Sequence, residues 1–298
     1  MALEKVSTCP ICNATKFAPL IVCKDHTTSQ EFFEIQNCET CGLALTNPRP
    51  DSQTIGKYYA SNSYISHNAK PNSVLDSVYF LARRFTLQWK KKLISSYANT
   101  GSLLDYGCGT GEFLNICRKN GWDCSGVEPS EEARAIALQT TGINICKNYE
   151  DLGNKKFDAI TLWHVLEHVH DLNKLIDHLK NSLTKSGILL IAVPNYKSLD
   201  AIVYQQYWAG YDVPRHLWHF SKETMTLLLK KHELRLNEIL PMKLDSLYVS
   251  ILSEGYQHNG KKRIKGLWRG LYNGLNSNLK ARRTNNYSSL IYVCTLQA

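Results

Sequence analysis

The sequence predicts a doubly wound α/β fold, a mostly parallel sheet with helices on both faces, preceded by a small cysteine-rich module. Short apolar segments near residues 102, 123, 144, 158 and 188 alternate with segments of helical periodicity, as in a parallel sheet. A glycine-rich turn links the first of these strands to the helix after it. Two Cys-x-x-C pairs precede this pattern, within residues 1–50.

The composition is that of an ordinary globular protein, and 298 residues suffice for one sizeable domain and an appendage. The first seven residues lack the apolar stretch of a secretion signal, and the longest apolar run, Ile188 to Pro194, is too short to cross a bilayer. Ten cysteines in such a chain favour reduced thiols or metal ligands over disulfides. We therefore expect a soluble, cytoplasmic protein with no transmembrane segment.

The net charge of +9 is concentrated near the C-terminus. From Gly255 onward there is no Asp or Glu, but there are eight basic residues: Lys261, Lys262, Arg263, Lys265, Arg269, Lys280, Arg282 and Arg283. This basic insertion near residues 255–285 also contains Trp268 and Tyr272. Such a segment suits a phosphate-bearing substrate, a nucleic acid or peripheral contact with an anionic membrane surface. The alternative is a solvated segment that only keeps the protein soluble.

The module at residues 1–50 is defined by four cysteines: Cys9, Cys12, Cys38 and Cys41. Two Cys-x-x-C turns can point four thiolates at one ion and complete a tetrahedral site. The strands expected between them, Phe17 to Val22 and Phe32 to Ile35, bury too little apolar surface to fold alone, so metal binding would supply the missing stability. Because four thiolates close the coordination shell, we predict a zinc ribbon whose ion is structural.

A connecting or lid segment, residues 51–98, is expected between the ribbon and the main domain at residues 99–298. Its first part is polar and rich in tyrosine, including Tyr58, Tyr59 and Tyr64. Its second part, Val74 to Tyr97, has helical periodicity with basic residues on one side. We expect this helix to pack on the main domain.

A nucleoside-binding site is predicted where the run Asp105 to Gly111 joins a short apolar strand to a helix. Glycines at such a turn allow positive φ and let a ligand approach the backbone closely. The next strand, Asp123 to Val127, ends in Glu128, whose carboxylate can accept both ribose hydroxyls of an adenosine. The spacing is G-x-G-x-G with a preceding acid, whereas dinucleotide enzymes use G-x-G-x-x-G.

From Leu103 to about Pro194 the chain resembles the class I S-adenosylmethionine-dependent methyltransferases. The glycine turn resembles their first motif, Glu128 matches their ribose-binding acid, and Gly187 to Asn195 resembles their fifth strand. The resemblance implies S-adenosylmethionine as cofactor and a Rossmann-like sheet of seven strands, the last of them antiparallel. It places the acidic turn of Glu150 and Asp151 near the adenine, without choosing between them. The cofactor-binding residues expected from it are Asp105, Gly107, Cys108, Gly109, Gly111, Glu128, Asp151 and Trp163.

Two segments are predicted at the carboxyl edge of the sheet, where ligands bind in such folds. The first, Leu162 to His168, contains an H-x-x-E-H pattern formed by His164, Glu167 and His168. In the ubiquinone-pathway O-methyltransferases and the small-RNA 3′-end methyltransferases the matching segment is E-x-x-E-H and binds a divalent ion. The sequence Leu-Glu-His is structural in other relatives. A second metal ion bound by these three residues is therefore one interpretation, and a purely structural role is the other.

The second segment, Tyr207 to Phe220, is rich in aromatic residues and histidines, and a substrate is expected to dock there. Either His216 or His219 can act as the catalytic base, since imidazole titrates near neutral pH, and His168 is a third candidate. Arg215 can hold a phosphate or a carboxylate. The alternative is that the aromatic residues form the packed underside of a loop and the histidines satisfy local hydrogen bonds.

We expect methyl transfer to a small-molecule or glycan-precursor acceptor, with oxygen as the accepting atom. A similar aromatic segment with Pro-Arg-His occurs in zinc-ribbon-bearing methyltransferases of small-molecule and glycan pathways. Some sugar C-methyltransferases also combine four N-terminal cysteines with this fold, and neither resemblance identifies the substrate. One alternative is a nucleic-acid methyltransferase that grips phosphates, although the ribbon itself is not basic. The other is a non-catalytic binding protein, against which the intact cofactor residues Asp105, Gly107, Gly109 and Glu128 argue.

Overall fold

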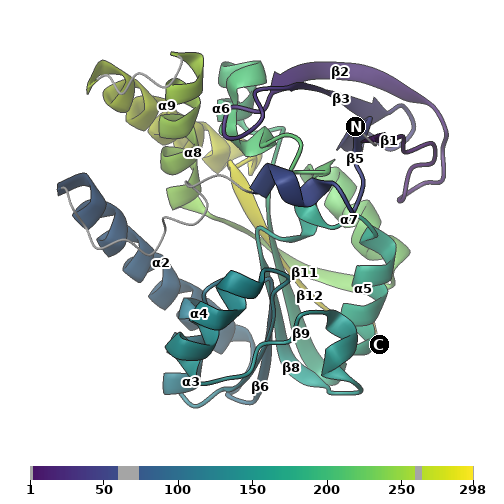
Figure 1. The fold of residues 1–298 in the computed structure, drawn as a ribbon, viewed down its shortest axis with the longest axis vertical. Helices are drawn as coiled ribbons and strands as arrows, with labels where there is room; N and C mark the ends of the chain where they lie inside the picture. Colours follow the sequence, from purple (N-terminus) through teal and green to yellow (C-terminus); the bar gives the residue numbers. More distant parts are fainter. Residues whose placement is uncertain (1–2, 60–73, 259–263, 298) are drawn as a thin grey trace.

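The structure, a computed structural model, describes residues 3–59, 74–258 and 264–297. Figure 1 shows a small N-terminal sheet, containing β2 (Phe17–Lys24) and β3 (Phe32–Cys38), that lies beside one end of a larger central sheet. Helices α3 (Glu112–Lys119) and α4 (Glu131–Thr141) lie on one side of the central sheet, and α5 (Leu172–Asn181) and α7 (Lys222–Lys231) lie on the other. The chain therefore forms a sheet covered by helices on both faces, with an added N-terminal module.

The central sheet has six strands in the described residues. Their order is β11 (Leu234–Pro241), β12 (Ser289–Leu296), β9 (Leu183–Pro194), β8 (Phe157–Trp163), β6 (Ser102–Tyr106) and β7 (Asp123–Val127). Strands β7, β6, β8 and β9 pair in parallel, and only β12 runs antiparallel to its two neighbours. This arrangement confirms the doubly wound, mostly parallel α/β class, including its final antiparallel strand.

The strand predicted near residue 144 is reduced to a single parallel bridge between Cys146 and Val127. Capping arrangements bound this short segment on both sides. Gly142 ends α4 in the left-handed conformation, and a capping box at Asn148 begins the short 3-10 helix η3 (Tyr149–Leu152). The described residues thus contain six strands and this bridge in place of the seven strands expected.

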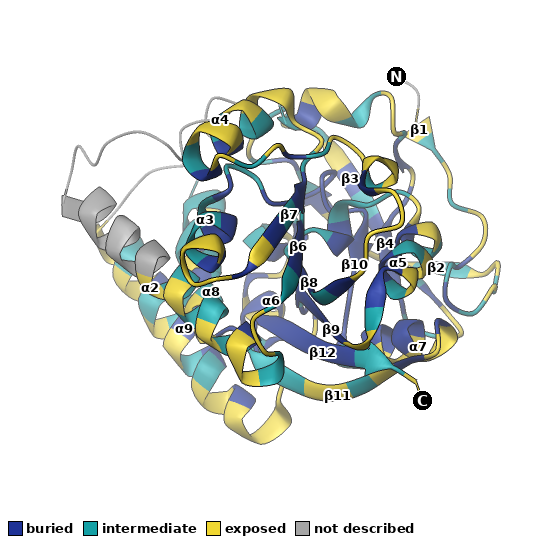
Figure 2. Ribbon diagram, turned by 90° about the horizontal axis from the view of Figure 1, so that it is seen from below, coloured by how far each residue is buried: buried dark blue, intermediate teal, exposed yellow. Residues whose placement is uncertain are grey.

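Of the remaining α-helices, one precedes the first strand of the central sheet and the others follow its strands. These helices are α2 (Val74–Tyr97), α6 (Leu199–Tyr204), α8 (Lys243–Gln257) and α9 (Ile264–Thr284). The helix expected at residues 74–97 has the bounds of α2. Figure 2 shows that β8, β9 and β12 are buried along most of their length. A continuous apolar run such as Ile188 to Val193 is what a strand covered on both faces requires.

The N-terminal sheet includes a strand from the main domain. Its order is β10 (Trp218–His219), β4 (Ala44–Thr46), β3 and β2, and β10 pairs antiparallel with β4. A separate pair joins β1 (Leu3–Glu4) to β5 (Arg49–Pro50). The loop that carries the candidate histidines is therefore built into the sheet of the N-terminal module.

The basic insertion predicted near residues 255–285 lies in a helical hairpin, α8 and α9, between β11 and β12. The basic residues Lys261, Lys262 and Arg263, like Tyr64 of the connecting segment, lie outside the described residues. No helix in the described part of the chain is long and apolar enough to span a membrane.

Candidate functional site

The glycine turn after β6 adopts a backbone that only glycine tolerates well. Gly107, Gly109 and Gly111 all have left-handed φ angles, of 75°, 54° and 77°. A Cβ on Gly107 would lie 2.5 Å from a methyl carbon of Val165, so this position needs glycine for space as well. No atom of the described residues lies within 4 Å of a Cβ built on Gly109, which leaves open space beside the backbone at the centre of the turn.

Glu128, at the end of β7, holds the turn in place. Its Oε2 accepts a hydrogen bond from the Gly109 backbone N–H at 3.0 Å, and its Oε1 accepts one from the Ser130 N–H at 2.9 Å. The carboxylate therefore lies between the carboxyl ends of β6 and β7. The predicted residue Cys108 is buried beneath the turn, and the side chain of Asp151 caps η3 by accepting from the Asn148 N–H.

Asp105 is buried at the end of β6 and accepts a hydrogen bond of 2.6 Å from the Thr161 hydroxyl. Burial disfavours its ionised form and raises its pKa to about 7, although the Thr161 hydrogen bond opposes the shift. An acid in this state ionises readily when a cation arrives, so Asp105 is suited to bind a positively charged group.

Two aromatic side chains, Trp163 and Phe113, pack together at the end of β8 and form an aromatic wall. The ring of Trp163 packs edge-on against Phe113, and the Nζ of Lys90 lies 4.3 Å from the centre of the Trp163 ring. Lys90 brings α2 to the site, a contact that no sequence motif indicated. The Nε1 atom of Trp163 is buried and has no hydrogen-bond partner within the described residues, so a donor is available toward a ligand.

A cluster of one acid and two histidines includes residues that follow β8 in the chain. Glu167 and His168 come from the short 3-10 helix η4 (Leu166–His168), and His216 comes from the loop before β10. The rings of His168 and His216 lie edge to face, with centroids 4.6 Å apart. One ligand-type atom from each of Glu167, His168 and His216 falls within 4.8 Å of the others. His216, about 50 residues later in the chain, thus joins two members of the H-x-x-E-H pattern.

His164 makes different contacts from the other members of that pattern. Its Nε2 lies 2.8 Å from Oδ2 of Asp245 on α8, and its Nδ1 lies 3.3 Å from Oε1 of Glu167. Burial alone would lower the pKa of His164, but its interactions with these two acids, Asp245 above all, outweigh it and raise the pKa to about 10. His164 is therefore a cation bridging Asp245 and Glu167.

The carboxylate of Glu167 is buried and makes few polar contacts. Its Oε1 has only looser ion-pair contacts, with His164 Nδ1 at 3.3 Å and His216 Nε2 at 3.9 Å, and neither oxygen has a hydrogen-bond partner within the described part of the chain. Buried carboxylates are costly unless they are paired, hydrogen-bonded or bound to a metal. The cluster is therefore suited to accept a proton or a cation.

The three candidate bases have different surroundings. Nδ1 of His216 lies 2.9 Å from the Gly210 carbonyl oxygen, so in the neutral ring this nitrogen carries the proton and Nε2 carries the lone pair. Nε2 lies 3.9 Å from Glu167. Burial, reinforced by the neighbouring His216, lowers the pKa of His168 to about 4. His219 faces the N-terminal module, where its Nε2 lies 3.1 Å from the Thr46 hydroxyl, and burial holds its pKa well below the usual range.

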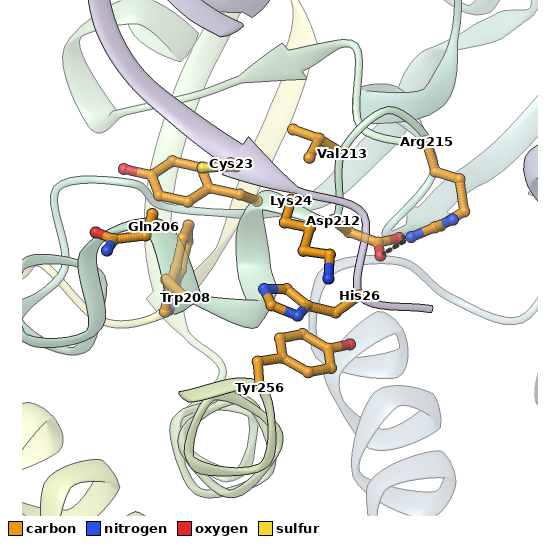
Figure 3. A pocket seen from close by; sticks show the side chains of 10 residues that line it. Cys23, Lys24, His26, Gln206, Trp208, Asp212, Val213, Arg215 and Tyr256 are labelled. Carbon is orange, nitrogen blue, oxygen red and sulfur yellow. Dashed lines mark hydrogen bonds and ion pairs between the residues drawn. The ribbon is translucent and has the colours of Figure 1, made fainter. Parts of the chain in front are cut away.

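Arg215, a candidate for binding phosphate, is occupied by an internal ion-pair network. It is 2% exposed and contacts Asp212 at 2.6 Å and Asp25 of the N-terminal module at 3.1 Å. Its Nη1 also donates to the Tyr58 carbonyl at 3.0 Å. Figure 3 shows the Asp212–Arg215 pair at the edge of a small cavity, in which the ring of His26 stacks on Tyr256. Arg215 therefore fastens the module to the histidine-bearing loop.

Replacing Arg215 by alanine is expected to lower the free energy of unfolding by about 3–5 kcal/mol, because it leaves the buried Asp25 carboxylate unpaired. Urea denaturation followed by circular dichroism measures the change. The matched control, Arg118→Ala at an exposed position, is expected to change it by less than about 0.5 kcal/mol. Equal stabilities of the two variants would contradict the structural role of Arg215.

The four cysteines of the module converge. The sulfurs of Cys9 and Cys41 are 3.5 Å apart, those of Cys12 and Cys38 are also 3.5 Å apart, and all four fall within 4.8 Å of one another. Four sulfurs bonded at about 2.3 Å to one tetrahedral zinc ion are spaced about 3.8 Å apart. The donor set and its spacing fit zinc. Cys23, a fifth cysteine of the module, is buried in β2 apart from this set.

The central domain matches a known protein family. Residues 79–239, more than half of the chain, match a family model described as a methyltransferase domain. The ubiquinone biosynthesis O-methyltransferase of Glaesserella parasuis is 31% identical over 106 residues, which cover 31% of this chain and 45% of the relative. That of Pelagibacter ubique is 29% identical over 168 residues, covering 52% of this chain and 68% of the relative. The chain spans about half the length of most of these curated relatives.

Among solved structures, the magnesium protoporphyrin IX methyltransferase of Synechocystis, with bound S-adenosylhomocysteine, superposes with a TM-score of 0.54. It is 14% identical and the match covers 83% of this chain and all of that one. At this identity the likeness concerns the fold.

Proposed function

Since this chain belongs to the methyltransferase-domain family, we propose that it transfers the methyl group of S-adenosylmethionine to a hydroxyl oxygen of a small-molecule acceptor. One observation carries this proposal: the open glycine turn, with Asp105 and Glu128 beside it, lies at the same edge of the sheet as the cluster of Glu167, His168 and His216. The first set is suited to hold the cofactor, and the second to take a proton from the acceptor.

The cofactor would lie across the carboxyl ends of β6, β7 and β8. The Glu128 carboxylate would accept hydrogen bonds from the ribose hydroxyls, and the Asp105 carboxylate would attract the positively charged amino group at the methionine end. The open space beside Gly109 would let the cofactor approach the backbone. Trp163, with its free Nε1–H, and Phe113 would form an apolar wall.

Methyl transfer is an in-line displacement, in which a bond from the acceptor oxygen to the methyl carbon forms as the carbon–sulfur bond breaks. S-adenosylhomocysteine leaves as a neutral thioether, so the acceptor hydroxyl must lose a proton. The Gly210 carbonyl fixes the His216 tautomer, which leaves Nε2 to accept that proton. Glu167 lies near enough to stabilise the imidazolium that forms.

A divalent cation held by Glu167, His168 and His216 is the second candidate for this cluster. The buried Oε2 of Glu167 favours it, because this oxygen has no hydrogen-bond partner within the described residues and could coordinate the ion. Such an ion would lower the pKa of an acceptor hydroxyl. His216 would then be a ligand through Nε2 and not the base. Turnover that survives dialysis against a chelator favours the base, whereas turnover restored only by added Mg²⁺ or Mn²⁺ favours the cation.

We propose a phenolic hydroxyl as the acceptor, because the matching relatives carry the name of an O-methyltransferase of ubiquinone biosynthesis. A glycan-precursor hydroxyl is the second acceptor class. The test is transfer of a labelled methyl group from S-adenosylmethionine to catechols, to nucleotide sugars and to RNA. Label in the ether of a catechol supports the proposal, and label only in RNA or at a nitrogen contradicts it.

For the four-cysteine set, we propose one structural zinc ion. Its position relative to the active site supports a second role, since β4 begins three residues after Cys41 and pairs with β10. The hydroxyl of Thr46 donates a hydrogen bond of 2.7 Å to the His216 carbonyl oxygen. An ordered ribbon would therefore fix the backbone that carries His216, and Thr46 would be a positioning residue.

Cofactor binding is expected to weaken as the pH falls from 7 to 5.5, because the raised pKa of Asp105, about 7, keeps its carboxyl protonated there. The amino group of the cofactor pairs with the ionised form, so binding must first expel a proton. The Kd for S-adenosylhomocysteine should rise by up to about tenfold per pH unit below 7 and level off above it. Calorimetry measures this, and Asp105→Asn should bind weakly with little pH dependence. A similar pH slope in Asp105→Asn would assign the effect to another group.

A further inference from the structure

Helix α9 (Ile264–Thr284) presents its small residues to the protein and its large apolar residues to solvent. The buried positions are Gly270, Gly274, Ser277 and Ala281. The exposed apolar positions, with their exposed fractions, are Ile264 (77%), Trp268 (68%), Tyr272 (68%), Leu275 (54%) and Leu279 (57%). Both sets recur every three or four residues, so at 100° per residue they define two opposite faces of one helix.

Close packing on α8 maintains this orientation. A Cβ added to Gly270 would lie 2.8 Å from the Cα of Ile251, and one added to Gly274 would lie 2.7 Å from the backbone oxygen of Ser246. Side chains as large as leucine or tryptophan would clash at these positions. The helix therefore cannot rotate to bury its apolar face against its own chain.

The charges of α9 have one sign. The helix contains five basic and no acidic residues, and the basic ones, all exposed, are Lys265, Arg269, Lys280, Arg282 and Arg283. By helical position, four of these flank one side of the apolar face, and Arg282 lies on the other side. Arg269 lies 3.7 Å from Glu254 of α8, and its side chain remains 62% exposed. The apolar face is thus bordered by positive charge.

We propose that α9 docks on the surface of a membrane that contains anionic phospholipids, with its axis in the membrane plane. Ile264, Leu275 and Leu279 would enter the acyl boundary, while Trp268 and Tyr272 would lie at the headgroup level, which indole and phenol rings favour. The flanking Lys and Arg side chains would meet lipid phosphates.

The charge and the apolar surface of α9 together favour an anionic membrane over a second copy of the chain or a nucleic acid. A second copy of the chain would bring two basic helices together, and a nucleic acid would leave the aliphatic side chains Ile264, Leu275 and Leu279 without a partner. An anionic bilayer satisfies both the apolar face and its basic border. Docking by α9 does not depend on which acceptor is methylated.

The test is sedimentation of the full chain with vesicles of phosphatidylcholine alone and with vesicles containing one quarter phosphatidylglycerol. Binding is expected only to the anionic vesicles and should weaken as salt is raised. Leu275→Ser/Leu279→Ser and, separately, Lys265→Glu/Arg283→Glu should each lower the apparent affinity by about tenfold or more. The matched controls are Leu138→Ser/Leu227→Ser and Lys119→Glu/Lys230→Glu, at exposed positions outside α9, which should bind like the parent chain.

Unchanged binding of S-adenosylhomocysteine shows that each variant is folded. Failure of the folded parent chain to bind anionic vesicles would overturn the proposal, as would full binding by Leu275→Ser/Leu279→Ser. Light scattering measures whether the chain forms a dimer through this face. A dimer that this variant abolishes, in a chain that ignores vesicles, would identify a second copy as the occupant of the face and would also overturn the proposal.

Discussion

Replacing His216 by alanine is expected to lower turnover by about 10²–10⁴-fold, while the Kd for S-adenosylmethionine changes by no more than about twofold. The reason is geometric. Nδ1 of His216 is fixed by the Gly210 carbonyl, and Nε2 lies 3.9 Å from Glu167 in the buried cluster, which includes none of the residues proposed to bind the cofactor. Steady-state rates with a phenolic acceptor, together with calorimetric titration of the cofactor, measure the two quantities.

The matched control is His258→Ala, at the end of α8 and outside the cluster, which should retain turnover within about twofold. If His216→Ala also retains its turnover, His216 is neither the base nor a required metal ligand. His168 would then be the next candidate, since it shares the cluster. His219 would follow, although its ring faces Thr46 of the N-terminal module.

Cys38→Ser is expected to lower the zinc content from one ion per chain to well below half. It should also lower the melting temperature by roughly 10 °C, because metal binding supplies much of the stability of a small ribbon. Turnover should fall as well, because the ribbon strand β4 positions the His216 backbone through Thr46. Metal analysis, differential scanning calorimetry and the methyl-transfer assay measure these three effects.

Cys23→Ala is the matched control, because Cys23 is a buried cysteine of the same module that lies outside the four-sulfur set. It should keep its zinc. A Cys38→Ser chain with normal zinc content and melting temperature would contradict the structural metal. A chain that loses zinc but keeps full turnover would contradict the coupling through Thr46.

The features that the sequence predicted well depend on local patterns. Helical periodicity defines the helix at 74–97, and an unbroken apolar run defines the buried strand at 188–194. The glycine turn and Glu128 were found for the same reason, since spacing along the chain determines which residues meet after β6 and β7. The four cysteines converge because each Cys-x-x-C pair already forms half of a site.

The features that the sequence did not reveal depend on contacts between distant segments. Nothing local to Trp218 indicates that it pairs with Leu45, or that Arg215 would be buried against Asp25. The joining of His216 to Glu167 depends on the same tertiary arrangement. The strand expected near residue 144 had the right apolar character, but the caps on both sides left it a single bridge.

Calorimetric titration of the purified, zinc-containing protein with S-adenosylhomocysteine tests the central claim most directly. We expect binding in the micromolar range, weakened by about 10–100-fold in Glu128→Ala, because charged hydrogen bonds to the ribose are lost. Glu131→Ala, an exposed neighbour in α4, should bind normally. Absence of binding in the folded protein, or undiminished binding by Glu128→Ala, would contradict the cofactor site assigned to β6 and β7.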